Sequence, residues 1–165
     1  LLGGETFLQP SQKLFESYLY EAIQKNNSNY MIVEGESKKI GRLLLPEKFH
    51  SKMITGKKIW VELPLEVRAK RLAEEYNNSN EFILDKLQYL KRFMNSKIYI
   101  SITEAIAAKD RYTAAYLLLR HHYDSHYLKG SPDKGSEREY AKVFKADSFQ
   151  KMEEEVLDYF THLTV

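Results

Sequence analysis

Residues 30–46 read YMIVEGESKKIGRLLLP, an apolar run followed at once by a dense group of charged side chains. Tyr30 to Val33 form a short continuous apolar run, which is typical of a strand buried on both faces of a parallel sheet. In an open α/β sheet, ligands bind outside the carboxyl ends of the strands. The stretch therefore predicts a buried strand with a ligand site at its end, and a solvated loop with ordinary charge pairing is the alternative.

The neighbouring segments extend this pattern into a βαβ unit. A second apolar run, residues 59–63, ends at Pro64, and residues 46–54 between the two runs predict a short helix closed by Gly56. Apolar residues recur at helical spacing over residues 10–25, where Pro10 suits a first helical position, so this segment predicts a core-packed helix. We expect an α/β fold in which the strands at 30–33 and 59–63 are parallel neighbours.

Beyond Pro64 the periodicity becomes helical. Apolar spacings of three and four predict helices over residues 65–76, about 80–94, about 99–108 and about 111–123. Residues 128–139 are rich in glycine and charge and predict a surface loop, followed by a strand at 140–144 and a helix over 149–162 capped by Ser148. We expect one domain over residues 1–165, with a sheet core to about residue 76, a helical part to about 127, and a loop, strand and terminal helix after it.

Composition narrows the function classes. The 165 residues are 43% hydrophobic and carry a formal net charge of +2, which suits one sizeable core and argues against a strongly basic nucleic-acid coat. There is no cysteine, so disulfides, thiolate metal sites and cysteine nucleophiles are excluded. No apolar run approaches the length of a transmembrane helix. We expect a cytoplasmic protein without a membrane partner.

Two groups of charged residues are candidates for phosphate chemistry. After the first predicted strand, Glu34 or Glu36 can hold Mg²⁺ or a water, while Lys38, Lys39 and Arg42 can neutralise phosphate. Arg68 and Arg71 lie three apart on one predicted helix, so both guanidiniums can clamp an anion, and salt bridging to nearby glutamates is the alternative. His121, His122 and His126 match no zinc signature, and we do not expect them to bind a metal.

Three segments, in this order and at these gaps, resemble a known family. QPSQKLFESYLYEAI (9–23), VEGESKKIGRLLLP (33–46) and WVELPLEVRAKRLAEEY (60–76) are similar to the C-terminal P-loop domain of bacterial tRNA 2-selenouridine synthase. KDRYTAAYLLLRHHYDSHY (109–127) is also similar to a helix of that family that ends in Tyr-Asp. The fit covers most of residues 3–127. The positions that match are Gly3, Gly4, Gln9, Pro10, Ser11, Gln12, Phe15, Glu16, Glu34, Glu36, Ser37, Ile40, Gly41, Arg42, Pro46, Pro64, Glu66 and Arg68.

The resemblance implies a P-loop NTPase-like fold, with a parallel sheet flanked by helices and a helical C-terminal half. It also implies a transferase that replaces sulfur by selenium in the wobble 2-thiouridine of tRNA, using selenophosphate through an S-geranyl intermediate made from geranyl diphosphate. In that family a rhodanese-like domain with a reactive cysteine precedes the P-loop domain. This sequence has no cysteine and no GxxxxGK[ST] motif, and Met94 and Asn95 stand where a glycine-rich turn is expected. We therefore expect a fragment, the visible part of a longer protein, or a subunit of a split enzyme.

Resemblance and chemistry together assign the candidate roles. Glu36, and second Glu34, are the expected catalytic carboxylates, and Glu36 is the expected Mg²⁺ ligand. The expected phosphate and substrate binders are Gln9, Ser11, Gln12, Ser37, Lys38, Arg42, Arg68 and Arg71. Lys13, Lys38 and Lys39 are expected to contact the tRNA backbone. The sequence does not assign a role to ATP or GTP.

Two other functions stay open. An arginine-bearing helix after a strand also suits a relative of the P-loop kinases that act on nucleosides or small molecules, and only the substrate would separate it from the tRNA enzyme. A non-catalytic P-loop-like scaffold is the other alternative, and phosphate binding would argue against it.

Overall fold

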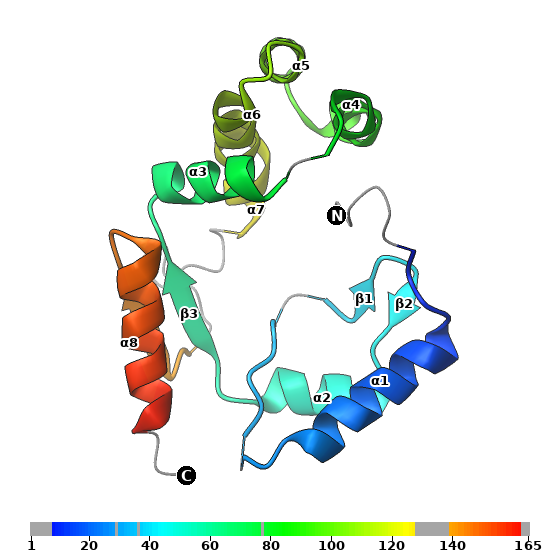
Figure 1. Cartoon of the computed structure of the whole chain (residues 1–165), viewed down its shortest axis with the longest axis vertical. Helices are drawn as coiled ribbons and strands as arrows, with labels where there is room; N and C mark the ends of the chain where they lie inside the picture. Colours follow the sequence, from blue (N-terminus) through cyan, green and yellow to red (C-terminus); the bar gives the residue numbers. More distant parts are fainter. Residues whose placement is uncertain (1–7, 29, 36, 77, 128–138, 163–165) are drawn as a thin grey trace. The chain divides into compact units, whose positions relative to one another are not determined.

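The computed structural model describes residues 8–28, 30–35, 37–76, 78–127 and 139–162 (Figure 1). The described residues form two compact units, with the division between Lys58 and Ile59. No helix among them is long and apolar enough to span a membrane. The predicted single domain stays a prediction.

The first unit contains two helices and one small hairpin. Helix α1 spans Gln12–Lys25, strands β1 (Lys39–Ile40) and β2 (Leu43–Leu44) pair antiparallel, and helix α2 spans Glu47–Thr55. Both helices predicted for this part are confirmed. Helix α1 begins two residues later than predicted, because Ser11 is its N-cap and accepts a hydrogen bond from the backbone N–H of Leu14.

The prediction of a buried strand at residues 30–33 is wrong. These residues lie outside any strand, and Met31, Ile32 and Val33 are exposed. An apolar run becomes a buried strand only if neighbouring strands and a covering layer are present, and the described residues provide neither for this run. None of the residues of helix α1 is buried, so the prediction of a core-packed helix is also wrong.

The second unit contains a two-stranded parallel sheet. Strand β3 (Ile59–Glu62) pairs with β4 (Lys142–Lys145) in the register Ile59 with Lys142 through Glu62 with Lys145. The strands predicted near 59–63 and 140–144 are confirmed. The parallel partner of β3 is β4, so the prediction that residues 30–33 pair with it is wrong. Helix α8 (Phe149–Thr161), capped by Ser148, covers the sheet around Phe144 and Met152.

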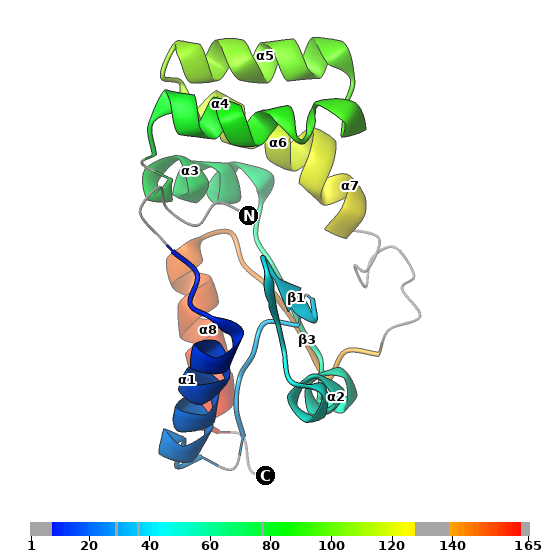
Figure 2. The same ribbon diagram turned by 90° about the vertical axis from the view of Figure 1, so that its right-hand side faces the viewer.

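The other elements described in this unit are helices. The helices are α3 (Leu65–Glu75), α4 (Asn80–Gln88), α5 (Ser96–Ala107) and α6 (Arg111–Leu118), with a short 3₁₀ turn η1 (Lys91–Phe93) between α4 and α5. Figure 2 shows α4 and α5 side by side, and α6 packs against both α3 and α5. Ile102 and Ile106 of α5 are fully buried at the centre of this cluster, beside Leu87 of α4 and Ala114 of α6.

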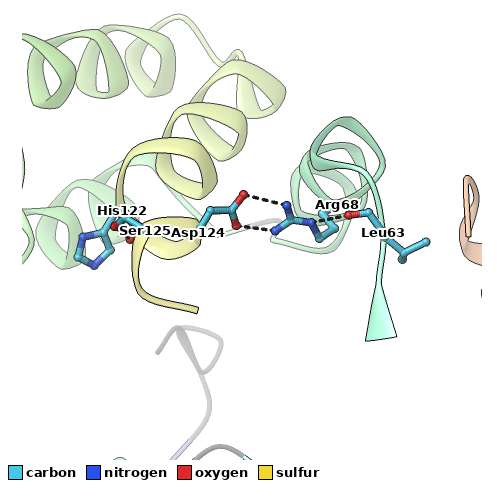
Figure 3. Close-up of polar contacts among 5 residues, drawn as sticks. All are labelled: Leu63, Arg68, His122, Asp124 and Ser125. Atoms are coloured by element: carbon cyan, nitrogen blue, oxygen red, sulfur yellow. Dashed lines mark hydrogen bonds and ion pairs between the residues drawn. The ribbon is translucent and has the colours of Figure 1, made fainter. Parts of the chain in front are cut away.

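Helix α6 does not continue regularly to residue 123 as predicted. It passes into a π-helical segment, η2 (Leu119–Tyr123), and then into the short helix α7 (Asp124–Tyr127). A π-turn adds one residue per turn and so changes the direction in which later side chains point. Asp124, the first residue of α7, points toward α3 (Figure 3). The fold class is α/β and mostly helical, and the P-loop NTPase-like sheet stays a prediction.

Candidate functional site

The hairpin of the first unit is tied to the start of α1 by two glutamine side chains. The Gln9 amide donates to the carbonyl oxygen of Ile40 at 2.9 Å, and its Oε1 accepts from the backbone N–H of Arg42 at 3.0 Å. The Gln12 amide donates to the carbonyl of Leu44 at 2.8 Å, and its Oε1 accepts from the N–H of the same residue at 3.0 Å. Each carboxamide therefore pairs with backbone as a neighbouring strand would.

Gly41 makes this arrangement possible. Its φ is +60°, a left-handed conformation that L residues other than glycine adopt at a cost. A Cβ atom on Gly41 would lie 2.5 Å from Nε2 of Gln9 and 2.6 Å from its Oε1. The glycine of the IGR motif is thus required both by the turn and by the close approach of the Gln9 side chain.

The predicted phosphate binders of this unit have partners within it. The hydroxyl of Ser11 caps α1, and the hydroxyl of Ser37 accepts from the N–H of Lys39 at 3.1 Å. The Arg42 guanidinium donates through Nη2 to the carbonyl oxygen of Gln9. Gln9, Gln12 and Arg42 therefore join the hairpin to the start of the helix, while Ser11 and Ser37 make local contacts, and the phosphate-binding role of all five stays a prediction.

Lys38 forms an ion pair with Glu47 of α2. The hydrogen bond and the charge of the ammonium lower the pKa of the Glu47 carboxyl. The Lys38 side chain is 42% exposed and that of Glu47 is 74% exposed, so the pair is a weak surface pair. An anion that reached Lys38 would compete with Glu47 for the ammonium.

Arg68, at the start of the second unit, is held from two sides (Figure 3). Its Nε donates to the carbonyl oxygen of Leu63 at 3.0 Å, while Nη1 and Nη2 donate to the two carboxylate oxygens of Asp124 at 2.7 and 2.9 Å. The Asp124 hydrogen bonds raise the pKa of Arg68. The guanidinium fork thus fixes the end of β3 and the start of α7 to helix α3.

Arg71 has different partners from Arg68. Its guanidinium carbon lies 3.8 Å from the ring centroid of Phe149, and its Nε lies 3.5 Å from Oε2 of Glu75. Salt bridging to a nearby glutamate, the predicted alternative, is confirmed for Arg71, whereas Arg68 pairs with an aspartate 56 positions away. All three nitrogens of the Arg68 guanidinium donate to protein oxygens, so an anion there would compete with Asp124. Anion binding by Arg68 and Arg71 stays a prediction.

The predicted carboxylates receive less structural support. Glu34 is exposed, and Glu36, the expected Mg²⁺ ligand, lies outside the described residues, as do Gly3 and Gly4. The described residues contain no group of three or more histidine, aspartate or glutamate side chains placed to hold a metal ion. Lys13 and Lys39, predicted to contact RNA, are exposed and form no ion pair within the described part of the chain.

Two important partners were not predicted. For Asp124, which holds Arg68, the sequence pattern indicates only the end of a helix, and for Glu47, which holds Lys38, it indicates no role. The Tyr-Asp pair at 123–124 was part of the family resemblance and could have drawn attention to Asp124. No local signal marks Glu47, because an exposed ion pair nine residues apart leaves no periodicity in the sequence.

Comparison with known proteins shows what the chain is similar to. A family model described as the tRNA 2-selenouridine synthase AAA domain matches residues 1–88. A tRNA 2-selenouridine synthase of Nitrosomonas europaea is 37% identical over 78 residues, which are 45% of this chain and 20% of that protein. One of Shewanella frigidimarina is 39% identical over 71 residues, or 41% of this chain and 19% of the relative. The chain thus matches about a fifth of the length of these relatives. No solved structure matches it significantly.

Proposed function

Because the chain belongs to the tRNA 2-selenouridine synthase AAA domain family, we propose that it is part of an enzyme that converts 2-thiouridine of tRNA to 2-selenouridine. The observation that carries the proposal is the family match over residues 1–88, which contains the whole hairpin with its glutamine contacts. The resemblance on the QPSQ and ESxxIGR motifs is therefore confirmed at the level of the family.

The proposed chemistry uses selenophosphate as selenium donor and geranyl diphosphate to form an S-geranyl intermediate. In each reaction a phosphate or diphosphate group gains negative charge as its bond breaks, and fixed cations near its oxygens lower the barrier. Within the first unit, Lys38 and Arg42 are the cations proposed for this task. Lys38 is the more readily available of the two, because its present partner is an exposed carboxylate.

The hydrogen bonds of Gln9 and Gln12 to the hairpin support a positioning role for the residues that do not contact phosphate. Gln9 and Gln12 hold the turn that carries Arg42, and Gly41 allows that turn to approach them. Arg68 fixes the residues that follow β3 by its contact with Leu63. We therefore propose that these residues set the geometry of the loops on which the reacting groups bind, and that Glu36 supplies the carboxylate for Mg²⁺ or for a water.

The test is selenouridine formation on a thiolated tRNA by a protein of the relatives' full length that carries these residues. Glu36→Gln keeps the shape but removes a charged ligand, and we expect it to abolish most activity while leaving the fold intact. Arg42→Ala is expected to weaken diphosphate binding by about 1.5–3 kcal/mol, the scale of a hydrogen bond to a charged group. Lys70→Gln, on an exposed position of α3, is the control. Wild-type rates from Glu36→Gln would show that this loop is not a catalytic site.

A further inference from the structure

The end of helix α4 and the turn η1 carry two large aromatic side chains that are exposed to solvent. Tyr89 is 68% exposed and Phe93 is 58% exposed. Together with Gln88, Lys91 and Arg92 they form what is called here the α4–η1 surface. Gln88, Tyr89, Lys91 and Arg92 line an open hollow of about 590 Å³ on it. Single exposed rings are ordinary on a protein surface, but two of them four residues apart beside an open hollow are a candidate contact surface.

The charges around these rings have one sign. Residues 86–103 include four basic side chains, Lys86, Lys91, Arg92 and Lys97, and no acidic one. Asp85, the acidic residue that precedes this stretch in the sequence, lies 3.0 Å from the Lys86 ammonium and pairs with it. Lys91 and Arg92 form no ion pair within the described residues. A chain whose net charge is only +2 thus concentrates unpaired positive charge beside its exposed rings.

Basic groups also lie against the aromatic faces. The Arg92 guanidinium carbon lies 4.6 Å from the Phe93 ring centroid, and the Lys91 ammonium lies 5.5 Å from that of Tyr99. Phe93 is still more than half exposed with Arg92 on it, so ring surface stays open to solvent. A stacked guanidinium and ring together present a flat, positively charged platform.

These features select one kind of partner. An apolar protein partner would leave Lys91 and Arg92 buried without counter-charges, at a high cost. A duplex offers phosphates but keeps its bases stacked inside, where the two rings do not reach them. An unpaired RNA strand offers both a flat base for each ring and a phosphate for each cation. We infer that the α4–η1 surface binds single-stranded RNA, with bases stacked on Tyr89 and Phe93 and phosphates held by Lys91 and Arg92.

This inference rests on the proposed function, which makes tRNA the substrate, and it adds a contact site to the lysines Lys13, Lys38 and Lys39 predicted earlier. An enzyme that modifies a base must engage unpaired nucleotides, because a base inside a duplex is inaccessible. The α4–η1 surface would hold nucleotides beside the modified one, and it takes no part in bond breaking. Loss of RNA binding at this surface is therefore not expected to abolish selenouridine formation measured at saturating tRNA.

The first experiment measures binding of the full 165-residue chain to a fluorescein-labelled 12-nucleotide oligouridine by fluorescence anisotropy. Removal of one stacked ring costs about 1–3 kcal/mol per base, so Tyr89→Ala or Phe93→Ala should weaken binding by about 5- to 140-fold. Tyr89→Phe keeps the ring and should bind like the parent. Tyr20→Ala is the matched control, because Tyr20 is 64% exposed but stands between Glu16 and Glu21.

The second experiment separates charge from shape. If Lys91 and Arg92 each hold one phosphate, Lys91→Gln with Arg92→Gln should reduce the slope of log K against log salt by about 1.4, or 0.7 for each phosphate of a single strand. Lys70→Gln should leave that slope unchanged. Circular dichroism melting of every variant checks that the fold is intact, which we expect because all substituted side chains are exposed.

Four results would overturn the inference. The first is that the parent chain does not bind oligouridine, and the second is that Tyr89→Ala and Phe93→Ala bind it with the parent's affinity. The third is that the chain prefers a 12-base-pair RNA duplex to the single strand. The fourth is that Tyr89→Ala loses a dimer in size-exclusion chromatography without any change in RNA binding. The assay contains no selenium donor and no diphosphate. Loss of selenouridine formation in Glu36→Gln therefore tests the proposed function separately from this surface.

Discussion

Arg68 and Asp124, 56 positions apart in the chain, form a two-pronged ion pair in which Nη1 lies 2.7 Å from Oδ1 and Nη2 lies 2.9 Å from Oδ2. Their side chains are only 31% and 15% exposed. Such a parallel pair of charged hydrogen bonds is stronger and more specific in geometry than an ordinary surface ion pair. It connects α3 to α7 across the π-helical segment that precedes Asp124.

We expect Asp124→Ala to lower the free energy of unfolding by about 1.5–3 kcal/mol, because it leaves the partly buried guanidinium without its charged acceptor. Urea denaturation monitored by circular dichroism measures this change. Glu75→Ala is the control, because the Arg71–Glu75 pair is exposed and such pairs contribute at most about 1 kcal/mol. Equal losses in the two variants would show that the Arg68–Asp124 pair has no special weight.

Gly41→Ala should destabilise the hairpin of the first unit. The left-handed conformation costs an alanine about 1–2 kcal/mol, and the new Cβ would also displace the Gln9 side chain. Hydrogen exchange of the Arg42 amide, which donates to Gln9 Oε1, should become faster. Gly35→Ala is a matched control, since a Cβ there meets no atom within 4 Å. Unchanged exchange at Arg42 in Gly41→Ala would contradict the role assigned to Gln9.

The helices were predictable because their signals are local. Ser148 caps α8 and Pro64 precedes α3, and both ends lie within one residue of the prediction. The run at 30–33 shows the limit of such signals: its composition suits a buried strand, but a strand depends on neighbours that a local pattern cannot supply. Strand β3 pairs with residues 142–145, which follow it by about 80 positions and come after the helical segments in the sequence.

The sequence predicts which residues belong to the candidate site better than it predicts the contacts that they make. Gln9, Gln12 and Gly41 were singled out by the family motif, and the structure brings them together. Their role as backbone partners was not predicted, because each glutamine contacts residues more than 30 positions away. For the arginines, spacing on one helix face suggests a clamp, whereas Arg68 pairs with Asp124 of α7 and Arg71 lies against Phe149 of α8 besides pairing with Glu75 of its own helix.

Acid should weaken the start of helix α6 through Asp110. Its carboxylate accepts from the Thr113 N–H at 2.9 Å, and the hydrogen bonds from Thr113 lower the pKa of Asp110. A lowered folded pKa means that the contribution to stability is present above the unfolded value of about 3.9 and is lost as the pH falls through the folded value. Asp110→Asn keeps a capping oxygen but cannot titrate, so its stability below about pH 4 should fall less steeply. Thermal melts from pH 7 to pH 3 compare the two proteins, and parallel curves would refute the assignment.

The Lys38–Glu47 pair allows a test of anion binding in which one substitution should improve binding. If Lys38 holds a phosphate group, the Glu47 carboxylate competes with that group for the ammonium, and Glu47→Gln removes the competitor while keeping the side-chain shape. Exposed ion pairs are weak, so pyrophosphate should bind at most about fivefold more tightly to Glu47→Gln than to the parent. Lys38→Gln should bind pyrophosphate more weakly than the parent. The double variant should resemble Lys38→Gln, because Glu47 then has no ammonium with which to pair.

Isothermal titration calorimetry with pyrophosphate measures the affinity of all four proteins. Glu75→Gln controls for the loss of a negative charge elsewhere on the surface. If Glu47→Gln and Glu75→Gln strengthen binding equally, the effect is one of net charge, and Lys38 is an ordinary surface lysine that pairs with Glu47.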